Sequence, residues 1–158
     1  MRLKASKRPK AKSLKKKRGK TKNPLKKARK ELWELCKQII RKRYGNVCYT
    51  CGAKELSAGN WHTAHFIARS ICGLYLRYDL RNLRPGCYRC NISLAGNGAA
   101  FYRNLVAREG QEYVDAIFAD KERLTKLTPA FLAEKIAEYT LILGTLGDKP
   151  ETDTLPVE

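Results

Sequence analysis

The sequence has 158 residues, 43% of them hydrophobic and 30% charged, and a net charge of +18. Its length allows one compact domain with extensions, and no apolar run approaches the roughly 20 residues of a membrane span, which argues against a membrane-embedded function. The charge is uneven, because residues 1–45 hold 20 Lys and Arg against 2 Glu, whereas residues 46–158 are neutral overall. A polybasic segment ahead of a neutral body favours nucleic acid as a partner over an anionic lipid surface.

Residues 1–23 consist mainly of Lys, Arg, Ser and Gly without apolar periodicity, so we expect a disordered basic arm. They show neither the apolar stretch nor the cleavage site of a secretory signal. We therefore expect a cytoplasmic protein whose six cysteines bind metal more readily than they form disulfides, because the cytoplasm is reducing.

A basic amphipathic helix is expected at residues 24–45. Asn23 and Pro24 predict its start as an N-cap and a first-turn proline, and Gly45 ends the pattern. Its apolar face carries Ala28, Leu32, Leu35, Cys36, Ile39 and Ile40. For the opposite face and the preceding arm, we expect DNA contacts at Lys15, Lys16, Lys17, Arg18, Lys26, Lys27 and Lys30.

Residues 46–108 form the cysteine-bearing module. We expect strands at residues 47–50 and 61–67, with a Gly59-Asn60 turn ahead of the second. Two turn-sized pairs place four thiolates for a closed, tetrahedral structural zinc site, and they are Cys48-x2-Cys51 and Cys87-x2-Cys90. A redox dithiol or two unrelated pairs is the alternative. The interval between the pairs is longer than in a zinc ribbon, so it should hold further functional residues.

The remainder of the chain reads as helical. We expect one helix from Asn91 to about Arg108, with a helical extension over 109–144 that includes a last helix from Thr128-Pro129 to Gly144. Residues 145–158 are acidic and contain proline, so we expect a disordered tail. The fold class is therefore α+β, with a zinc-containing core between a basic helix and C-terminal helices.

Three polar residues occur in a fixed order around the second cysteine pair: His65 in the predicted strand, Asn82 before the pair and Asn91 directly after it. This order resembles the His-Asn-His (HNH) nucleases, whose ββα-metal fold grips a divalent cation between two strands and a helix. The resemblance implies that His65 is the general base, for which neutral imidazole is suited. It also implies that Asn82 orients His65 through the intervening loop and that Asn91 binds catalytic Mg²⁺ or Mn²⁺.

The resemblance can be narrowed to one family. The sequence resembles the NinG family of phage recombination proteins at His65-Phe66-x2-Arg69, Arg77-x-Asp79-x2-Asn82, Cys87-x2-Cys90-Asn91, Leu94-x-Gly96-Asn97 and Tyr102. This implies a structure-specific endonuclease that cleaves branched recombination intermediates, Holliday junctions and D-loops, in the cytoplasm of a bacterial host. Cutting two strands of a symmetric junction would suit a homodimer, and recombination proteins are possible further partners.

One position departs from the nuclease pattern. Many of these enzymes carry an Asp just before the catalytic His as a metal ligand, and this chain has Ala64 there. Because Mg²⁺ prefers several oxygen ligands, a further one must come from elsewhere. The candidates, in order, are Asp79, Asn97 and His62. Asp79 could equally form an ion pair with a neighbouring Arg, and Asn91 and Asn97 could be helix caps.

Arginine dominates the segment around the predicted site. From Arg69 to Arg108 there are seven Arg, no Lys and one acid, and Arg is suited to phosphate contacts and to charge building on phosphoryl oxygens. We expect Arg69 to assist at the scissile phosphate and the DNA backbone to meet Arg77, Arg81, Arg84 and Arg89. Each could instead be a solvated surface charge. The alternative for the whole chain is a non-catalytic zinc-containing nucleic-acid-binding protein, architectural or ribosome-associated.

Overall fold

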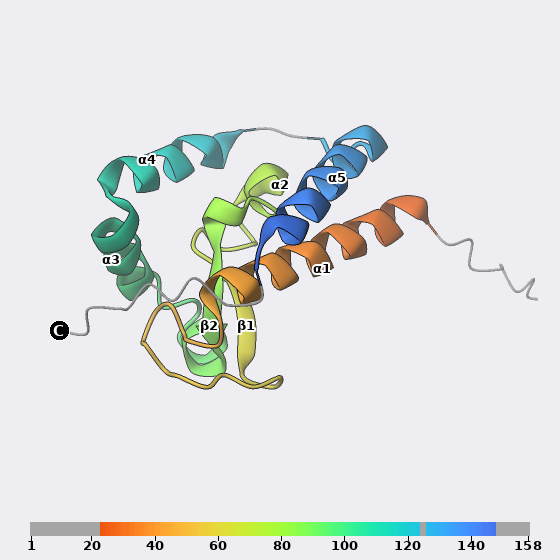
Figure 1. The fold of residues 1–158 in the computed structure, drawn as a ribbon. Helices are drawn as coiled ribbons and strands as arrows, with labels where there is room; N and C mark the ends of the chain where they lie inside the picture. The colour runs from red at the N-terminus through yellow and green to blue at the C-terminus, as the bar shows by residue number, and fades with distance from the viewer. Residues whose placement is uncertain (1–22, 124–125, 148–158) are drawn as a thin grey trace, which may run out of the picture.

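The computed structural model describes residues 23–123 and 126–147 (Figure 1). Within these ranges the elements are α1 (Pro24–Tyr44), β1 (Trp61–His65), α2 (Gly73–Leu76), η1 (Leu80–Asn82), β2 (Leu83–Cys87), η2 (Arg89–Ser93), α3 (Gly98–Glu109), α4 (Gln111–Ala119), η3 (Asp120–Glu122) and α5 (Pro129–Thr145). The α+β prediction is confirmed. The predicted DNA contacts Lys15, Lys16, Lys17 and Arg18 lie outside the described residues, as does most of the predicted tail.

Helices α1 and α5 pack side by side (Figure 1). Helix α1 starts as predicted, with the Asn23 side chain accepting a hydrogen bond from the Leu25 amide at 3.1 Å. Its buried stripe shares one apolar core with Leu132 and Tyr139 of α5. Helix α5 also starts as predicted, capped by Thr128, but it continues through Gly144 to Thr145. Packing against α1 extends it past the residue that we expected to end it. Among the described residues no helix is both long enough and apolar enough to cross a membrane.

Strands β1 and β2 form an antiparallel hairpin in which Trp61 faces Cys87 and His65 faces Leu83. The first of these strands was predicted two residues too long, and the strand predicted at 47–50 is wrong, because those residues turn around the first cysteine pair. Strand β2 was not predicted, since Pro85 and Gly86 both disfavour a strand. Pro85 lacks an amide hydrogen, but its carbonyl accepts a hydrogen bond from the Tyr49 amide at 2.8 Å.

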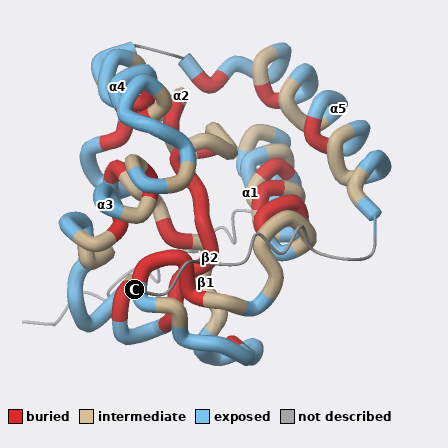
Figure 2. Tube along the Cα trace, turned by 60° about the vertical axis from the view of Figure 1, so that its left-hand side comes forward, coloured by how far each residue is buried: buried red, intermediate tan, exposed pale blue. Residues whose placement is uncertain are grey.

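The hairpin lies between α1 with α5 on one side and α3 on the other (Figure 1). Alternate residues of a strand point to opposite faces, so Trp61 and His65 face α1 and Ala64 faces α3. Strand β2 is buried along its whole length, whereas only Ala64 of β1 is fully buried (Figure 2). The hairpin therefore separates two distinct surroundings, one around His65 beside α1 and the other around Ala64 beside α3.

The helix predicted from Asn91 is interrupted. Asn91 lies in the single turn η2, and α3 begins at Gly98. Between them Ala95, Gly96 and Asn97 all have positive φ angles, of 48°, 94° and 47°, a conformation that a right-handed helix does not contain. Asn91 therefore belongs to the turn of the second cysteine pair and does not open α3.

Candidate functional site

The four paired cysteines converge on one point. All four sulfur atoms lie within 4.8 Å of one another, and Cys51 Sγ is 3.8 Å from Cys87 Sγ. A tetrahedral zinc ion with Zn–S bonds of about 2.3 Å holds its sulfurs about 3.8 Å apart. The cluster therefore fits a structural zinc ion whose four positions are all protein ligands.

Backbone amides shape both cysteine turns. The Gly52 amide donates to the Cys48 carbonyl at 2.9 Å, and Gly52 has a φ of 73°, which favours glycine. In the second turn the Cys90 amide lies 3.4 Å from Cys87 Sγ. Because Cys87 ends β2 and pairs with Trp61, a zinc ion here would anchor one end of the hairpin, and His65 lies at the other end.

His65 sits on the α1 face of the hairpin in a defined orientation. Its ring stacks on Trp33 of α1, with centroids 5.4 Å apart and planes 5° apart. Its Nε2 lies 3.0 Å from the Arg77 carbonyl oxygen. Since a carbonyl can only accept, Nε2 carries the hydrogen and Nδ1 keeps a lone pair. Burial lowers the pKa of His65 below its ordinary value of 6.5, so the ring is neutral at pH 7 and able to accept a proton.

Asn82 holds the loop that links His65 to Arg77. Its side chain is fully buried, accepts a hydrogen bond from the Ile67 amide at 2.7 Å, and donates to the carbonyls of Ile67 and Leu76 at 3.2 and 3.1 Å. It makes no hydrogen bond to the His65 ring. The bonds pull together the two ends of the loop, one of which presents the carbonyl that meets His65. This geometry agrees with an orienting role exerted through the loop.

A cationic pocket of about 250 Å³ opens at His65. It is lined by Arg29, Lys30, Trp33, His65, Arg69, Arg77 and Tyr78, and this set contains four cations and no acid. The Nε atom of Arg77 is buried without a hydrogen-bond partner, which leaves a donor for an anion. We call this the His65 pocket. Its donors and charge suit a phosphate group.

Sequence reasoning named Lys30, His65, Arg69 and Arg77 as site residues, but it did not name Arg29, Trp33 or Tyr78. Arg29 and Trp33 are four residues apart, so they share a face of α1, and that spacing was readable. What no local pattern reveals is that this face of α1 meets the end of β1, because the contact is made across more than 30 residues of sequence.

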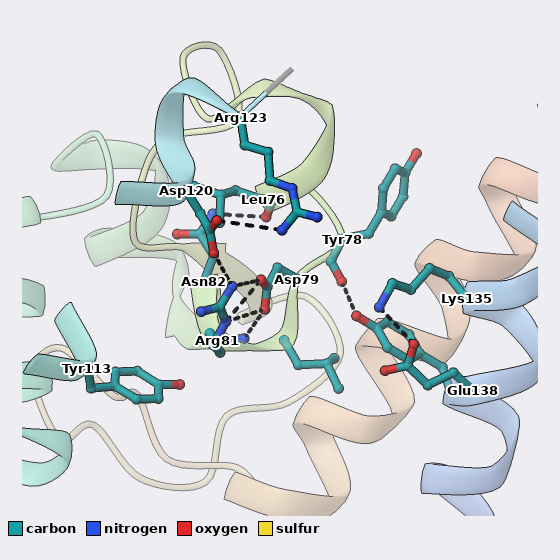
Figure 3. Close-up of polar contacts among 12 residues, drawn as sticks. Leu76, Tyr78, Asp79, Arg81, Asn82, Tyr113, Asp120, Arg123, Lys135 and Glu138 are labelled. Carbon is teal, nitrogen blue, oxygen red and sulfur yellow. Dashed lines mark hydrogen bonds and ion pairs between the residues drawn. The ribbon is translucent and has the colours of Figure 1, made fainter. Parts of the chain in front are cut away.

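The predicted ligands of a catalytic divalent cation are not gathered at His65. Asp79 accepts the Arg81 amide and pairs with the Arg81 guanidinium, which also binds Asp120 (Figure 3). Asn97 donates to Cys90 Sγ at 3.8 Å. The Cβ of Asn91 lies beside Gly86, on the α3 face of the hairpin. The described residues therefore offer no oxygen donor set for Mg²⁺ or Mn²⁺ at the His65 pocket.

His62 lies on the same face as Asn91. Its backbone pairs with Gly86, its ring is 5.9 Å from that of Tyr88, and its Nε2 is buried without a hydrogen-bond partner. An unpartnered buried imidazole nitrogen is unusual in a folded protein. Together with Asn91 it offers two donors near one glycine, so His62 is a stronger ligand candidate than its sequence context indicated.

Arg84 was expected to contact DNA, and this expectation is wrong. The residue is 1% exposed, its guanidinium binds Glu109 at 2.7 Å, and it lies over the rings of Tyr44, Tyr49 and Tyr113. A buried guanidinium with this many partners cannot reach a phosphate. Arg81 is engaged by two acids, which leaves it a weak phosphate contact, whereas Arg69 and Arg89 are exposed.

Comparison with known proteins identifies the family. The family model described as Bacteriophage Lambda NinG protein matches residues 1–147. The chain belongs to the NinG family. It is 31% identical over 120 residues to Protein ninG of Salmonella phage P22, covering 75% of this chain and 57% of that protein. It is 30% identical over 95 residues to Protein ninG of Escherichia phage lambda, covering 60% of this chain and 45% of that protein.

The chain spans about half the length of the NinG proteins that it matches. No solved structure matches it. The predicted family is therefore confirmed, whereas the predicted nuclease activity stays a prediction.

Proposed function

We propose that this protein is an endodeoxyribonuclease that hydrolyses phosphodiester bonds in branched recombination intermediates, such as Holliday junctions and D-loops. One observation carries the proposal. The imidazole of His65, neutral and with a lone pair on Nδ1, belongs to the lining of a pocket that has four cations and no acid. A pocket of this composition suits the placement of a base against a bound phosphodiester.

In the proposed reaction Nδ1 of His65 takes a proton from a water molecule as the water oxygen attacks phosphorus. The bond from phosphorus to the leaving 3′ oxygen breaks, and that oxygen takes a proton from solvent. The Arg77 carbonyl oxygen accepts a hydrogen bond from Nε2–H and so stabilises the imidazolium that forms. Arg69 and Arg77 offset the negative charge that builds on the phosphoryl oxygens. Exposed Lys26, Lys27 and Lys30 of α1 continue the cationic surface beyond the pocket and suit the DNA backbone on either side of the scissile bond.

A divalent cation belongs to the His-Asn-His resemblance, but the donor set at the His65 pocket does not fit one. The donors nearest to the predicted pattern, His62 and Asn91, lie on the other face of the hairpin. An imidazole and an amide suit Mn²⁺ better than Mg²⁺, which prefers oxygen. The role proposed for His65 therefore does not depend on a bound divalent cation, and cleavage has to be compared with and without Mg²⁺ or Mn²⁺.

The test is cleavage of a synthetic four-way junction by the full chain, with Mg²⁺, with Mn²⁺ and with a chelator. We expect His65→Ala to bind the junction with unchanged affinity and to lose cleavage by about two orders of magnitude or more, as for removal of a general base. Cleavage by His65→Ala at the wild-type rate would refute the assignment. Binding without cleavage by the wild-type chain on every branched substrate would favour a non-catalytic nucleic-acid-binding protein.

His62→Ala is the matched variant, because it removes the other histidine of the same strand. Retained cleavage in His62→Ala together with loss in His65→Ala assigns the chemistry to the α1 face of the hairpin. The reverse result assigns it to the α3 face, beside Asn91. Loss in both variants, with Mn²⁺ restoring part of the His62→Ala activity, would indicate that both faces contribute.

A further inference from the structure

A second cavity, of about 350 Å³, lies beside the His65 pocket. Residues of η1 and the segment before it form one wall, and α5 forms the other, through Phe131, Lys135, Glu138 and Tyr139. We call it the α5 cavity. Tyr78 lines both cavities, so they flank the same short segment of backbone. Its volume falls within the range of about 300–1,000 Å³ found for small-molecule sites.

The charges that line the α5 cavity are paired with one another. Arg81 binds Asp79 and Asp120, each at 2.6 Å, on one side. Lys135 binds Glu138 at 2.7 Å on the other (Figure 3). A phosphate or a free cation would therefore have to displace an existing partner. The cavity differs in this respect from the His65 pocket, whose four cations have no acid among them.

Four aromatic residues also line the cavity, and they are Tyr75, Tyr78, Phe131 and Tyr139. Tyr78 and Tyr139 are nearly buried, at 7% and 3% exposure, and the Tyr139 hydroxyl donates to the Tyr78 carbonyl at 2.7 Å. Tyr75 and Phe131 are half-buried. The Arg123 guanidinium lies over one face of the Tyr75 ring, 4.1 Å from its centroid, which leaves Phe131 and the other face of Tyr75 for a ligand. Aromatic walls beside paired polar groups suit a flat, uncharged ring with hydrogen-bonding edges.

We propose that the α5 cavity holds one unstacked nucleobase of the DNA strand whose phosphate occupies the His65 pocket. This inference rests on the proposed function. Moving a base out of the helix costs least where its pairing and stacking are already lost, so the cavity favours a branch point over continuous duplex. It thereby supplies a physical basis for structure-specific rather than sequence-specific cleavage.

A cationic side chain from a protein partner is the other ligand that an aromatic, acid-containing cavity takes. The paired state of Asp79, Asp120 and Glu138 argues against it. The cavity lies across Tyr78 from the His65 pocket, which suits a phosphate. This position favours a nucleobase over a protein side chain.

Photo-crosslinking tests the proposal directly. Full-length His65→Ala is bound to a four-way junction that carries 5-iodouracil at one nucleotide beside the branch, irradiated, and digested for peptide mapping. We expect crosslinks to Tyr75 or Phe131, and none to them from the same base placed in the middle of a duplex arm. Crosslinks that map only elsewhere, for example to the exposed rings of Tyr88 or Tyr102, would overturn the proposal.

An affinity measurement on variants gives a second test. Phe131→Ala removes one aromatic wall and should weaken junction binding by about tenfold, the loss typical of one base–aromatic stack, with binding to intact duplex unchanged. Leu141→Ala is the matched control, since Leu141 lies on the same helix, is 73% exposed and does not line the cavity. Unchanged junction affinity in Phe131→Ala would overturn the proposal and favour a protein ligand. An equal loss of affinity for junction and for duplex would also overturn it.

These outcomes separate the cavity from the proposed function. If the wild-type chain binds no branched DNA, both the proposed function and the nucleobase site are refuted. If the wild-type chain cleaves junctions, but Phe131→Ala binds them normally and the crosslinks map outside the cavity, only the nucleobase site is refuted. The role of His65 as the base is then unaffected.

Discussion

The indole of Trp33 lies flat against the imidazole of His65, with 5° between the two planes. The two residues come from elements that are far apart in the sequence, α1 and the end of β1. The stack buries one face of the imidazole, while the Arg77 carbonyl fixes Nε2. Two independent contacts therefore set the direction of Nδ1, and Trp33 acts as a positioning residue for the proposed base.

Replacing Trp33 tests this relationship. Burial is the largest cause of the lowered pKa of His65, so Trp33→Ala should raise that pKa toward 6.5, as followed by NMR titration of the imidazole. Junction cleavage at saturating substrate should fall by about tenfold or more, because the base loses its orientation, and Trp33→Phe should retain most of it. A fall in the His65 pKa would mean instead that stacking on the indole stabilises the imidazolium more than burial disfavours it.

The pH dependence of cleavage follows from the same group. His65 has a pKa below 6.5 in the folded chain, and only the neutral ring can act as the base. Cleavage should therefore rise with pH through a midpoint below 6.5 and be constant near pH 7. The same pKa shift lowers the free energy of unfolding as pH falls below 6.5, because His65 binds a proton in the unfolded chain at a pH where it is still neutral in the folded chain. A midpoint above 7 in kcat/KM profiles would exclude His65 as the titrating base.

Removal of the metal should affect the fold before the chemistry. Because the cysteine cluster closes the end of the hairpin, a strong chelator or Cys90→Ser should release about one zinc ion per chain and lower the thermal midpoint. Metal analysis and thermal unfolding measure the two effects. Cys72→Ala is the control, since Cys72 is buried in a separate apolar cluster with Ile67, Leu76 and Ile117. Zinc content that survives Cys90→Ser would contradict the four-cysteine site.

The four-cysteine cluster and the two long helices were predictable because their signals are local. Four cysteines in two pairs and an Asn-Pro or Thr-Pro helix start need no knowledge of distant contacts. Strand β2 was hidden because its pairing with β1 overrides the poor strand propensity of Pro85 and Gly86. The face of the hairpin on which each site residue lies was unpredictable for a related reason. His65 and Asn91 are in the expected order along the chain, yet His65 faces α1, and Asn91, in the turn of the second cysteine pair, lies on the α3 face.

Arg84 shows the same limit for a charged residue. Its neighbours in sequence are ordinary, and the partners that bury it come from α1, the first cysteine turn, α3 and α4. Its guanidinium donates to the carbonyls of Leu80, Arg81 and Leu83 at 2.8–3.3 Å. A single side chain thus joins the hairpin to the elements on both sides of it, which is a structural role that no local pattern distinguishes from phosphate binding.

Replacing this arginine should therefore destabilise the fold and leave DNA contacts intact. Arg84→Met keeps the approximate volume but leaves three carbonyls and Glu109 without their donor, and should lower the free energy of unfolding by about 3 kcal/mol. Urea unfolding followed by fluorescence measures the change. Arg84→Lys keeps the charge but cannot reproduce the planar fork or its stacking on tyrosine, so it should recover only part of the loss. Arg69→Met is the matched control, because Arg69 is exposed and should lower junction affinity with little effect on stability. The opposite pattern, with Arg84→Met stable and defective in binding, would return Arg84 to the DNA interface and require a different conformation of the hairpin.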